Sequence, residues 1–214
     1  MERIWTIFLF ASIVRGADVT AWISEGGETV NAVRWSATHQ AVKMFDAIGV
    51  SLEWAKVPPA ADQGVTIEVR FITHFDRVKP GVLAFSTPFD PKPVVTVLYD
   101  QIVVLTTAEP RYRAMLLAHV LVHEISHVLM RANMHSHEGM MKASWTLQDH
   151  RQMAMKRSLS FLPADVQAIR AGLASFGGRR VQQVESDPAP GRNAHGEGDE
   201  KRRSHRRTRE VNLW

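Results

Sequence analysis

The chain has 214 residues, of which 45% are hydrophobic and 22% charged, and its formal net charge is +4. This length predicts one domain with appendages and a hydrophobic core of useful size. Cysteine is absent, which excludes disulfides, cysteine-ligated zinc and a thiol nucleophile. Histidine and carboxylate side chains are therefore the strong metal ligands that the chain can offer.

The first sixteen residues are typical of a secretory signal peptide. A short charged start, Met1–Arg3, precedes the apolar run Ile4–Val14, which is shorter than the ~20 residues needed to span a bilayer. We expect cleavage after Gly16 in preference to Ala21, because the residues around Ala21 read as the first strand. An uncleaved anchor is the alternative. The signal predicts a secreted or periplasmic protein without a transmembrane segment after cleavage.

Residues 17–176 predict an α+β domain. Apolar residues from Val30 to Ile48 recur at three- and four-residue spacing, which indicates an amphipathic helix that ends at Gly49. Segments with extended, strand-like patterns give a sheet of about five strands. They are residues 18–24, 50–57, 66–73, 83–86 and 94–99.

A long apolar helix follows the last strand. We expect it to begin near Thr106 or Thr107, either of which can cap it, with Pro110 in its first turn. It should end near Ala132, and Asn133 is the residue predicted to adopt a left-handed conformation there.

Two shorter helices and a tail complete the chain. The first is expected over residues 146–158, where Thr146 and Asp149 suit a capping box, and the second opens at Pro163 and stops before Gly177. Trp145 and Phe161, which precede them, read as core aromatics. Residues 177–214 are rich in Gly, Pro, Ser, Arg and His, which predicts a disordered basic tail. Contact with a polyanion is the alternative for the tail, and no specific nucleic-acid binding is expected.

The long helix carries the motif HEISH at residues 123–127. His123 and His127 lie four residues apart and project from one helical face, so two imidazoles can bind one zinc ion. Glu124 points to another azimuth, beside the metal, as a general base requires. A core helix that buries these groups without a metal is the alternative, and it would be costly. His119 lies about 12 Å along the axis from His127, so we expect it to be a core or supporting histidine.

This segment resembles the zinc-binding region of the metzincin metallopeptidases, especially the matrixin-like branch. Their pattern continues from HExxH through a glycine turn to a third His, often followed by Ser, and a turn with Met below the metal. The matching positions are His123, His127 and His135 as ligands, Glu124 as base, Ser136 after the third ligand and Met141 in the Met-turn. The chain departs from the pattern in two places. Met130 stands at the turn glycine, and Asn133 stands at the usual third-histidine position, so His135 comes two residues late.

The resemblance implies a metzincin-like fold, in which a twisted mixed sheet backs the cleft and a short antiparallel edge strand holds the substrate. Leu83, Ala84, Phe85 and Ser86 occupy the position of that strand, because they precede the last strand before the zinc helix. An exposed edge can pair with an extended peptide through main-chain hydrogen bonds. A plain connector is the alternative reading.

The predicted function is a secreted zinc endopeptidase that acts on a peptide or protein substrate. It would hold one Zn²⁺ per chain and use Glu124 as the general base, and we expect a monomer. One alternative takes the third ligand from a carboxylate, Glu138 or Asp149. His135 is preferred because a Gly-x-Met turn follows it and Asp149 can cap a helix. Another alternative is a non-catalytic zinc-stabilised binding module, whose site a fourth ligand such as His137 or Glu138 would close.

Overall fold

The computed structural model describes residues 17–25, 31–60, 64–73 and 81–186, and residues 177–186 by their backbone alone. The signal peptide predicted over residues 1–16 and the tail beyond residue 186 lie outside this part of the chain. Within it, none of the helices combines the length and the apolar composition needed to span a bilayer.

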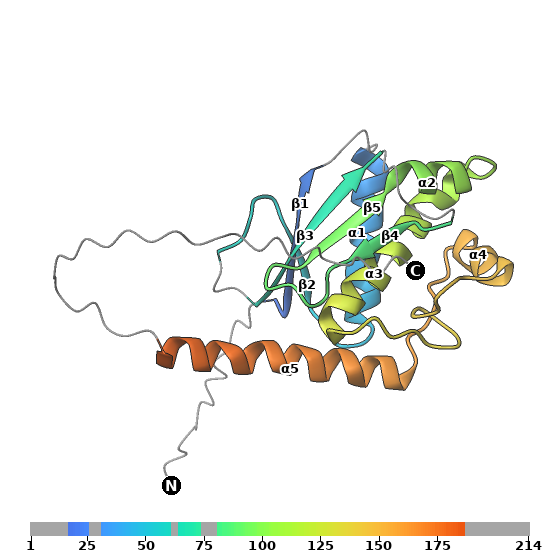
Figure 1. Cartoon of the computed structure of the whole chain (residues 1–214). Helices are drawn as coiled ribbons and strands as arrows, with labels where there is room; N and C mark the ends of the chain where they lie inside the picture. The colour runs from blue at the N-terminus through green and yellow to red at the C-terminus, as the bar shows by residue number, and fades with distance from the viewer. Residues whose placement is uncertain (1–16, 26–30, 61–63, 74–80, 187–214) are drawn as a thin grey trace, which may run out of the picture.

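A five-stranded mixed sheet forms the centre of the described part (Figure 1). Its order is β2-β1-β3-β5-β4, in which the first four are parallel to one another and β4 runs antiparallel to β5. The strands are β1 (Val19–Glu25), β2 (Leu52–Ala55), β3 (Val65–Ile72), β4 (Ala84–Ser86) and β5 (Val94–Leu98). The predicted α+β class and mixed sheet are confirmed, and β4 lies at the sheet edge, as the sequence predicted.

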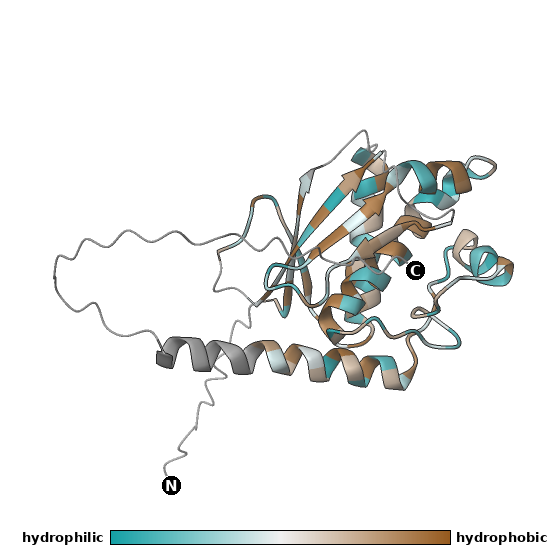
Figure 2. Cartoon of the chain, viewed as in Figure 1, coloured by the Kyte–Doolittle hydropathy of each residue, from teal (hydrophilic) through white to brown (hydrophobic). Residues whose placement is uncertain are grey.

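One face of the sheet forms the core. Side chains of β3 alternate between buried and half-buried, because successive residues of a strand point to opposite faces. The fully or nearly fully buried set on this strand is Val65, Ile67, Val69 and Phe71. Figure 2 shows brown, hydrophobic residues on the central strands and on helix α3, which lie together.

Helices α1 (Asn31–Asp46) and α3 (Arg113–Met130) pack against each other beside the sheet, and α5 (Pro163–Ser186) packs on α3. The contact between α3 and α5 is close enough to need a glycine. A Cβ atom built on Gly172 would lie 1.8 Å from the carbonyl oxygen of Leu129. Backbone therefore meets backbone here, which fixes α5 against the C-terminal half of α3.

The substitution Gly172→Ala tests this contact. Alanine favours an isolated helix by ~1 kcal/mol over glycine, but here its methyl group would force α5 away from α3. We expect the packing cost to prevail, with a net loss of about 1–3 kcal/mol in the free energy of unfolding measured by urea denaturation. A gain in stability, as helix propensity alone predicts, would show that the two helices are not held at this distance.

The predicted start of the long helix is wrong. A separate helix, α2 (Tyr99–Leu105), follows β5 directly, and α3 begins only at Arg113, after the 3-10 turn Pro110–Tyr112. Thr106 and Thr107 do not cap α3. Their hydroxyl groups donate to the carbonyls of Ile102 and Val103 in the preceding turn, so they end α2.

Other helix ends also differ from those predicted. The left-handed residue after α3 is Arg131 (φ 52°), two residues before Asn133, and its guanidinium lies 5.2 Å from the ring centroid of Phe176. Helix α4 (Leu147–Ala154) is shorter than expected but starts with the predicted capping box. Helix α5 passes through Gly177 to Ser186, because glycine costs a helix only ~1 kcal/mol and does not end it.

Candidate metal centre

The metal-binding motif lies in the C-terminal half of α3. This helix is apolar on nearly all sides, because α1, α5 and the sheet surround it. Its histidines are therefore buried as well: His123 is 9% exposed and His127 4% exposed. Their four-residue spacing places both rings on one face, and their ring centroids are 4.7 Å apart.

Two backbone contacts decide which nitrogen of each ring carries the proton. The Nδ1 atom of His123 lies 3.0 Å from the carbonyl oxygen of Met140, and that of His127 lies 2.9 Å from the carbonyl oxygen of Ala132. A carbonyl only accepts hydrogen bonds, so both Nδ1 atoms are the protonated donors. Burial, the largest cause for each ring, lowers both pKa values to about 4, so both rings are neutral at pH 7. Both Nε2 atoms therefore carry lone pairs.

These two Nε2 atoms lie 3.0 Å apart. Without a proton between them, two lone pairs at this distance repel each other, and a cation between them removes the repulsion. Nitrogen ligands at about 2.0–2.1 Å from one tetrahedral zinc lie roughly 3.3 Å apart, close to the distance found. The donor set therefore fits a metal ion.

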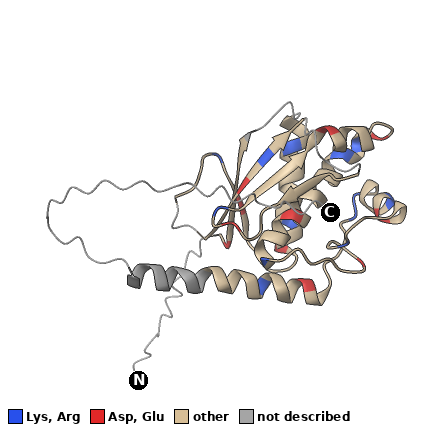
Figure 3. Ribbon diagram, in the orientation of Figure 1, with Lys and Arg blue, Asp and Glu red and all other residues tan. Residues whose placement is uncertain are grey.

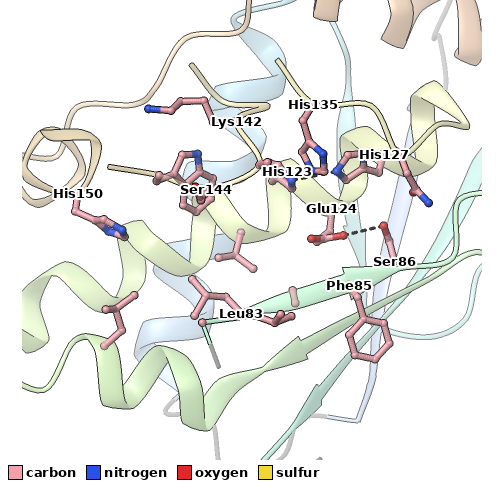
Figure 4. Close-up of a pocket in the computed structure, with 18 residues that line it drawn as sticks. Leu83, Phe85, Ser86, His123, Glu124, His127, His135, Lys142, Ser144 and His150 are labelled. Atoms are coloured by element: carbon pink, nitrogen blue, oxygen red, sulfur yellow. Dashed lines mark hydrogen bonds between the residues drawn. The ribbon is translucent and has the colours of Figure 1, made fainter. Parts of the chain in front are cut away.

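His135 completes the group. It comes from the loop after α3, and one ligand atom from each of His123, His127 and His135 lies within 4.8 Å of the others. His135 is the least buried of the three. Figure 4 shows the three rings turned toward one another. The predicted set of three histidines is thus brought together, close enough to bind a metal ion.

Hydrogen bonds hold the loop that carries His135. The next residue, Ser136, donates its backbone N–H to the carbonyl of Met141 at 2.7 Å and its hydroxyl to the carboxylate of Asp165 on α5. Gly139 has φ +75°, and a Cβ atom there would lie 2.2 Å from the carbonyl oxygen of Ser160. Only glycine fits this turn, which explains why Gly139 precedes Met140 and Met141.

The turn after Gly139 buries both of its methionines. Met140 and Met141 are each 0% exposed. Met140 also provides the carbonyl that orients His123. Met141, the predicted Met-turn residue, is therefore part of the hydrophobic core, and its place below a metal ion stays a prediction.

The alternative ligands lie elsewhere. His137 and Glu138 pair with each other at 3.6 Å with side chains 82% and 66% exposed. Asp149 accepts hydrogen bonds from Lys142 and from the backbone and hydroxyl of Thr146. Neither carboxylate belongs to the metal-binding group found among the described residues. The structure therefore favours His135 as the third ligand.

Glu124 is held by the edge strand. The hydroxyl of Ser86 on β4 donates to Oε2 of Glu124 at 2.8 Å (Figure 4). Burial raises the pKa of the Glu124 carboxyl, and the Ser86 hydrogen bond opposes the rise. A raised pKa makes a carboxylate a stronger base. The sequence pattern predicts only that Ser86 lies on the substrate strand, because no local pattern reports a contact across 38 positions.

A pocket of about 210 Å³ opens beside the histidines and Glu124. Its lining includes all four residues of the predicted edge strand, Leu83, Ala84, Phe85 and Ser86. Three of them form β4, and the carbonyl of Leu83 extends the pairing by accepting from the N–H of Leu98. The segment is therefore a true strand and not a plain connector. Among the lining residues outside the predicted site are Lys142 and His150.

Two predicted core residues support the site. Trp145 is half-buried, lines the pocket and sets its indole ring edge-on to the rings of His119 and His123. His119 is fully buried. Its Nδ1 bonds the carbonyl of Met115 at 2.7 Å, and its Nε2 accepts from the N–H of Leu159 at 3.0 Å. Both nitrogens are used, so His119 is a core histidine and not a ligand, as predicted.

This environment predicts a pH dependence of stability. Burial lowers the pKa of His119 from 6.5 to about 4, so the unfolded chain takes up a proton that the folded chain does not. The free energy of unfolding should therefore fall as pH drops from about 6.5 to 4, by ~3 kcal/mol from this residue. We expect metal-free His119→Gln, although less stable at pH 7, to lose less stability over this interval in urea denaturation. An equal fall in the free energy of unfolding in wild type and His119→Gln would contradict the assignment of His119 as a buried, neutral histidine.

No protein-family model, no curated protein and no solved structure matches this chain. The relationship to the metzincins therefore stays a prediction that rests on the motif.

Proposed function

We propose that this chain is a zinc-dependent endopeptidase of the metzincin type, exported from the cytoplasm. The observation that carries the proposal is the pair of unprotonated Nε2 atoms 3.0 Å apart on His123 and His127, with His135 and Glu124 beside them in one pocket. Three neutral imidazoles suit zinc and leave one coordination position open. A structural zinc site would close that position with a fourth protein ligand.

Glu124 performs the proton transfers in this mechanism. When bound, zinc acidifies a water molecule and polarises the scissile carbonyl of the peptide. Ser86 fixes one oxygen of Glu124, and the other oxygen takes the proton from the attacking water. Glu124 then gives this proton to the leaving amine. The hydrogen bonds from His123 and His127 to backbone carbonyls keep both rings in the tautomer that binds a metal.

The substrate binds along β4 in this proposal. As the edge strand, β4 pairs on one side with β5 and can pair on the other with an extended peptide. Ser86 points to Glu124 from this strand, so a peptide paired with β4 passes the general base. Figure 3 shows both acidic and basic residues on α4 and α5, and the proposal assigns no charge preference to the substrate.

Zinc reconstitution tests the proposed function. The metal-free protein should cleave no member of a broad peptide library, and one equivalent of zinc should restore cleavage that a chelator then abolishes. Hydrolysis at equal rates with and without the metal would contradict the proposal. So would a zinc-loaded, folded protein that cleaves none of the peptides.

A further inference from the structure

The pocket continues past the metal centre along α3. Two of the three proposed ligands, His123 and His127, lie in the C-terminal half of this helix. His150, which also lines the pocket, contacts Tyr112 at the N-terminus of the helix. Tyr112 precedes His123 by eleven positions, a rise of about 16 Å along the axis. In Figure 4, His150 lies across the pocket from His127. The pocket therefore has a second end, which the proposed catalytic groups do not use.

Part of the pocket lining is apolar. Leu83 from the segment before β4, Leu105 from the end of α2 and Val120 from α3 all line the pocket. Its volume of about 210 Å³ corresponds to roughly seven water molecules. This volume includes the metal end of the pocket, so the second end has room for no more than one substrate side chain.

A hydrogen bond fixes the tautomer of His150. The Tyr112 hydroxyl contacts Nδ1 of His150, and the sulfur of Met153 lies 3.7 Å away as a weaker acceptor. Burial raises the pKa of Tyr112, so the phenol stays protonated. An imidazole nitrogen is a stronger acceptor than a thioether sulfur, so we assign the phenol proton to the bond with Nδ1 of His150 and not to Met153. Burial also lowers the pKa of His150, so this ring is neutral at pH 7. Its single proton therefore lies on Nε2, and His150 offers a hydrogen-bond donor.

The charges near this end are already balanced. Lys142 is the cationic side chain among the pocket-lining residues that the structure describes, and its ammonium group donates to Asp149 at 2.5 Å. A substrate carboxylate would therefore meet no unpaired cation and would lose hydration without compensation. An uncharged acceptor, such as a carboxamide oxygen, needs only the N–H of His150.

We propose that His150 forms the polar end of a specificity subsite, which binds a substrate side chain with an aliphatic stem and an uncharged hydrogen-bond acceptor at its tip, as in glutamine. This inference rests on the proposed peptidase function. His150 is a specificity residue, since it contacts the substrate side chain and not the scissile bond. Tyr112 is a positioning residue, since it acts by holding the tautomer of His150.

Peptides that differ only in the side chain next to the scissile bond test the subsite. We compare glutamine with methionine, which has similar length and no strong acceptor, and with glutamate. Wild type should favour glutamine over each by about tenfold in kcat/KM, the ratio expected for one well-formed hydrogen bond in a buried site. His150→Phe should bring the glutamine-to-methionine ratio to about one. His137→Ala, a change of an exposed histidine outside the pocket lining, should leave the ratio at its wild-type value.

The nitrogen NMR shifts of His150 provide a second readout that needs no turnover. In wild type they should report a proton on Nε2 and a bare Nδ1, and in Tyr112→Phe a mixture of both tautomers. The opposite tautomer in wild type would overturn the inference, as would a glutamine-to-methionine ratio that His150→Phe leaves unchanged. Failure of wild type to cleave any peptide would overturn the proposed function together with the subsite. Cleavage by wild type with a glutamine-to-methionine ratio that does not depend on His150 would overturn the subsite alone.

Discussion

Replacing Glu124 by glutamine is expected to lower peptide hydrolysis by about 10²–10⁴-fold, the usual effect of losing a general base. Glutamine keeps the size of the side chain and can still accept the hydrogen bond from Ser86, but it cannot take a proton from water. The three histidines are untouched, so zinc content, measured by atomic emission, should stay at the wild-type level. The measurement is kcat/KM on the best peptide from a library.

Glu138→Gln is the matched control for this substitution. Glu138 lies in the loop next to the site, but its side chain is 66% exposed and does not belong to the metal-binding group. The same chemical change there should leave hydrolysis within about twofold of wild type, since surface substitutions have small effects. Equal hydrolysis by wild type and Glu124→Gln would refute the mechanism, whatever its metal content.

Replacing His127 by alanine is expected to abolish the stabilisation that zinc gives the wild type. A metal that binds only the folded chain stabilises it by ~4 kcal/mol at a thousandfold excess over Kd, which raises the melting temperature by roughly 10 °C for a domain of this size. Without His127 two ligands remain, and zinc at the same concentration should raise the melting temperature little. Calorimetric scans with and without zinc measure this increment.

The rise in melting temperature that zinc causes separates the loss of a metal ligand from the loss of packing. Removing the buried imidazole of His127 also changes the metal-free protein, so each variant is compared with itself. His137→Ala serves as control, because that side chain is 82% exposed and lies outside the group of three. It should keep the full increment. An undiminished increment in His127→Ala would mean that zinc binds elsewhere on the chain.

The group of three histidines could be predicted from the sequence because its pattern is local. The spacing of His123 and His127 places them on one face of any helix, and His135 and Gly139 follow within one short loop. The strands could be predicted for a similar reason, since the alternation in β3 is a property of consecutive residues. In both cases the pattern that gives the prediction is also the physical cause of the structure.

What the sequence did not reveal depends on contacts between distant segments. Thr106 suits a helix start in isolation, and only its bond to the carbonyl of Ile102 makes it the end of α2. Arg131 takes a left-handed conformation that asparagine adopts more easily. The link between Ser86 and Glu124, like the contact between Tyr112 and His150, spans 38 positions. These contacts exist only after β4, α3 and α4 have assembled around the pocket.

A crystal structure of the zinc-loaded protein, with anomalous diffraction recorded at the zinc absorption edge, tests the central claim most directly. The account predicts one zinc per chain, bound by Nε2 of His123, Nε2 of His127 and a ring nitrogen of His135, each at about 2.0–2.1 Å. The fourth position should hold a solvent molecule within hydrogen-bond distance of Glu124. Zinc bound through Glu138 or Asp149 with His135 turned away, or a fourth protein ligand in the open position, would contradict the account.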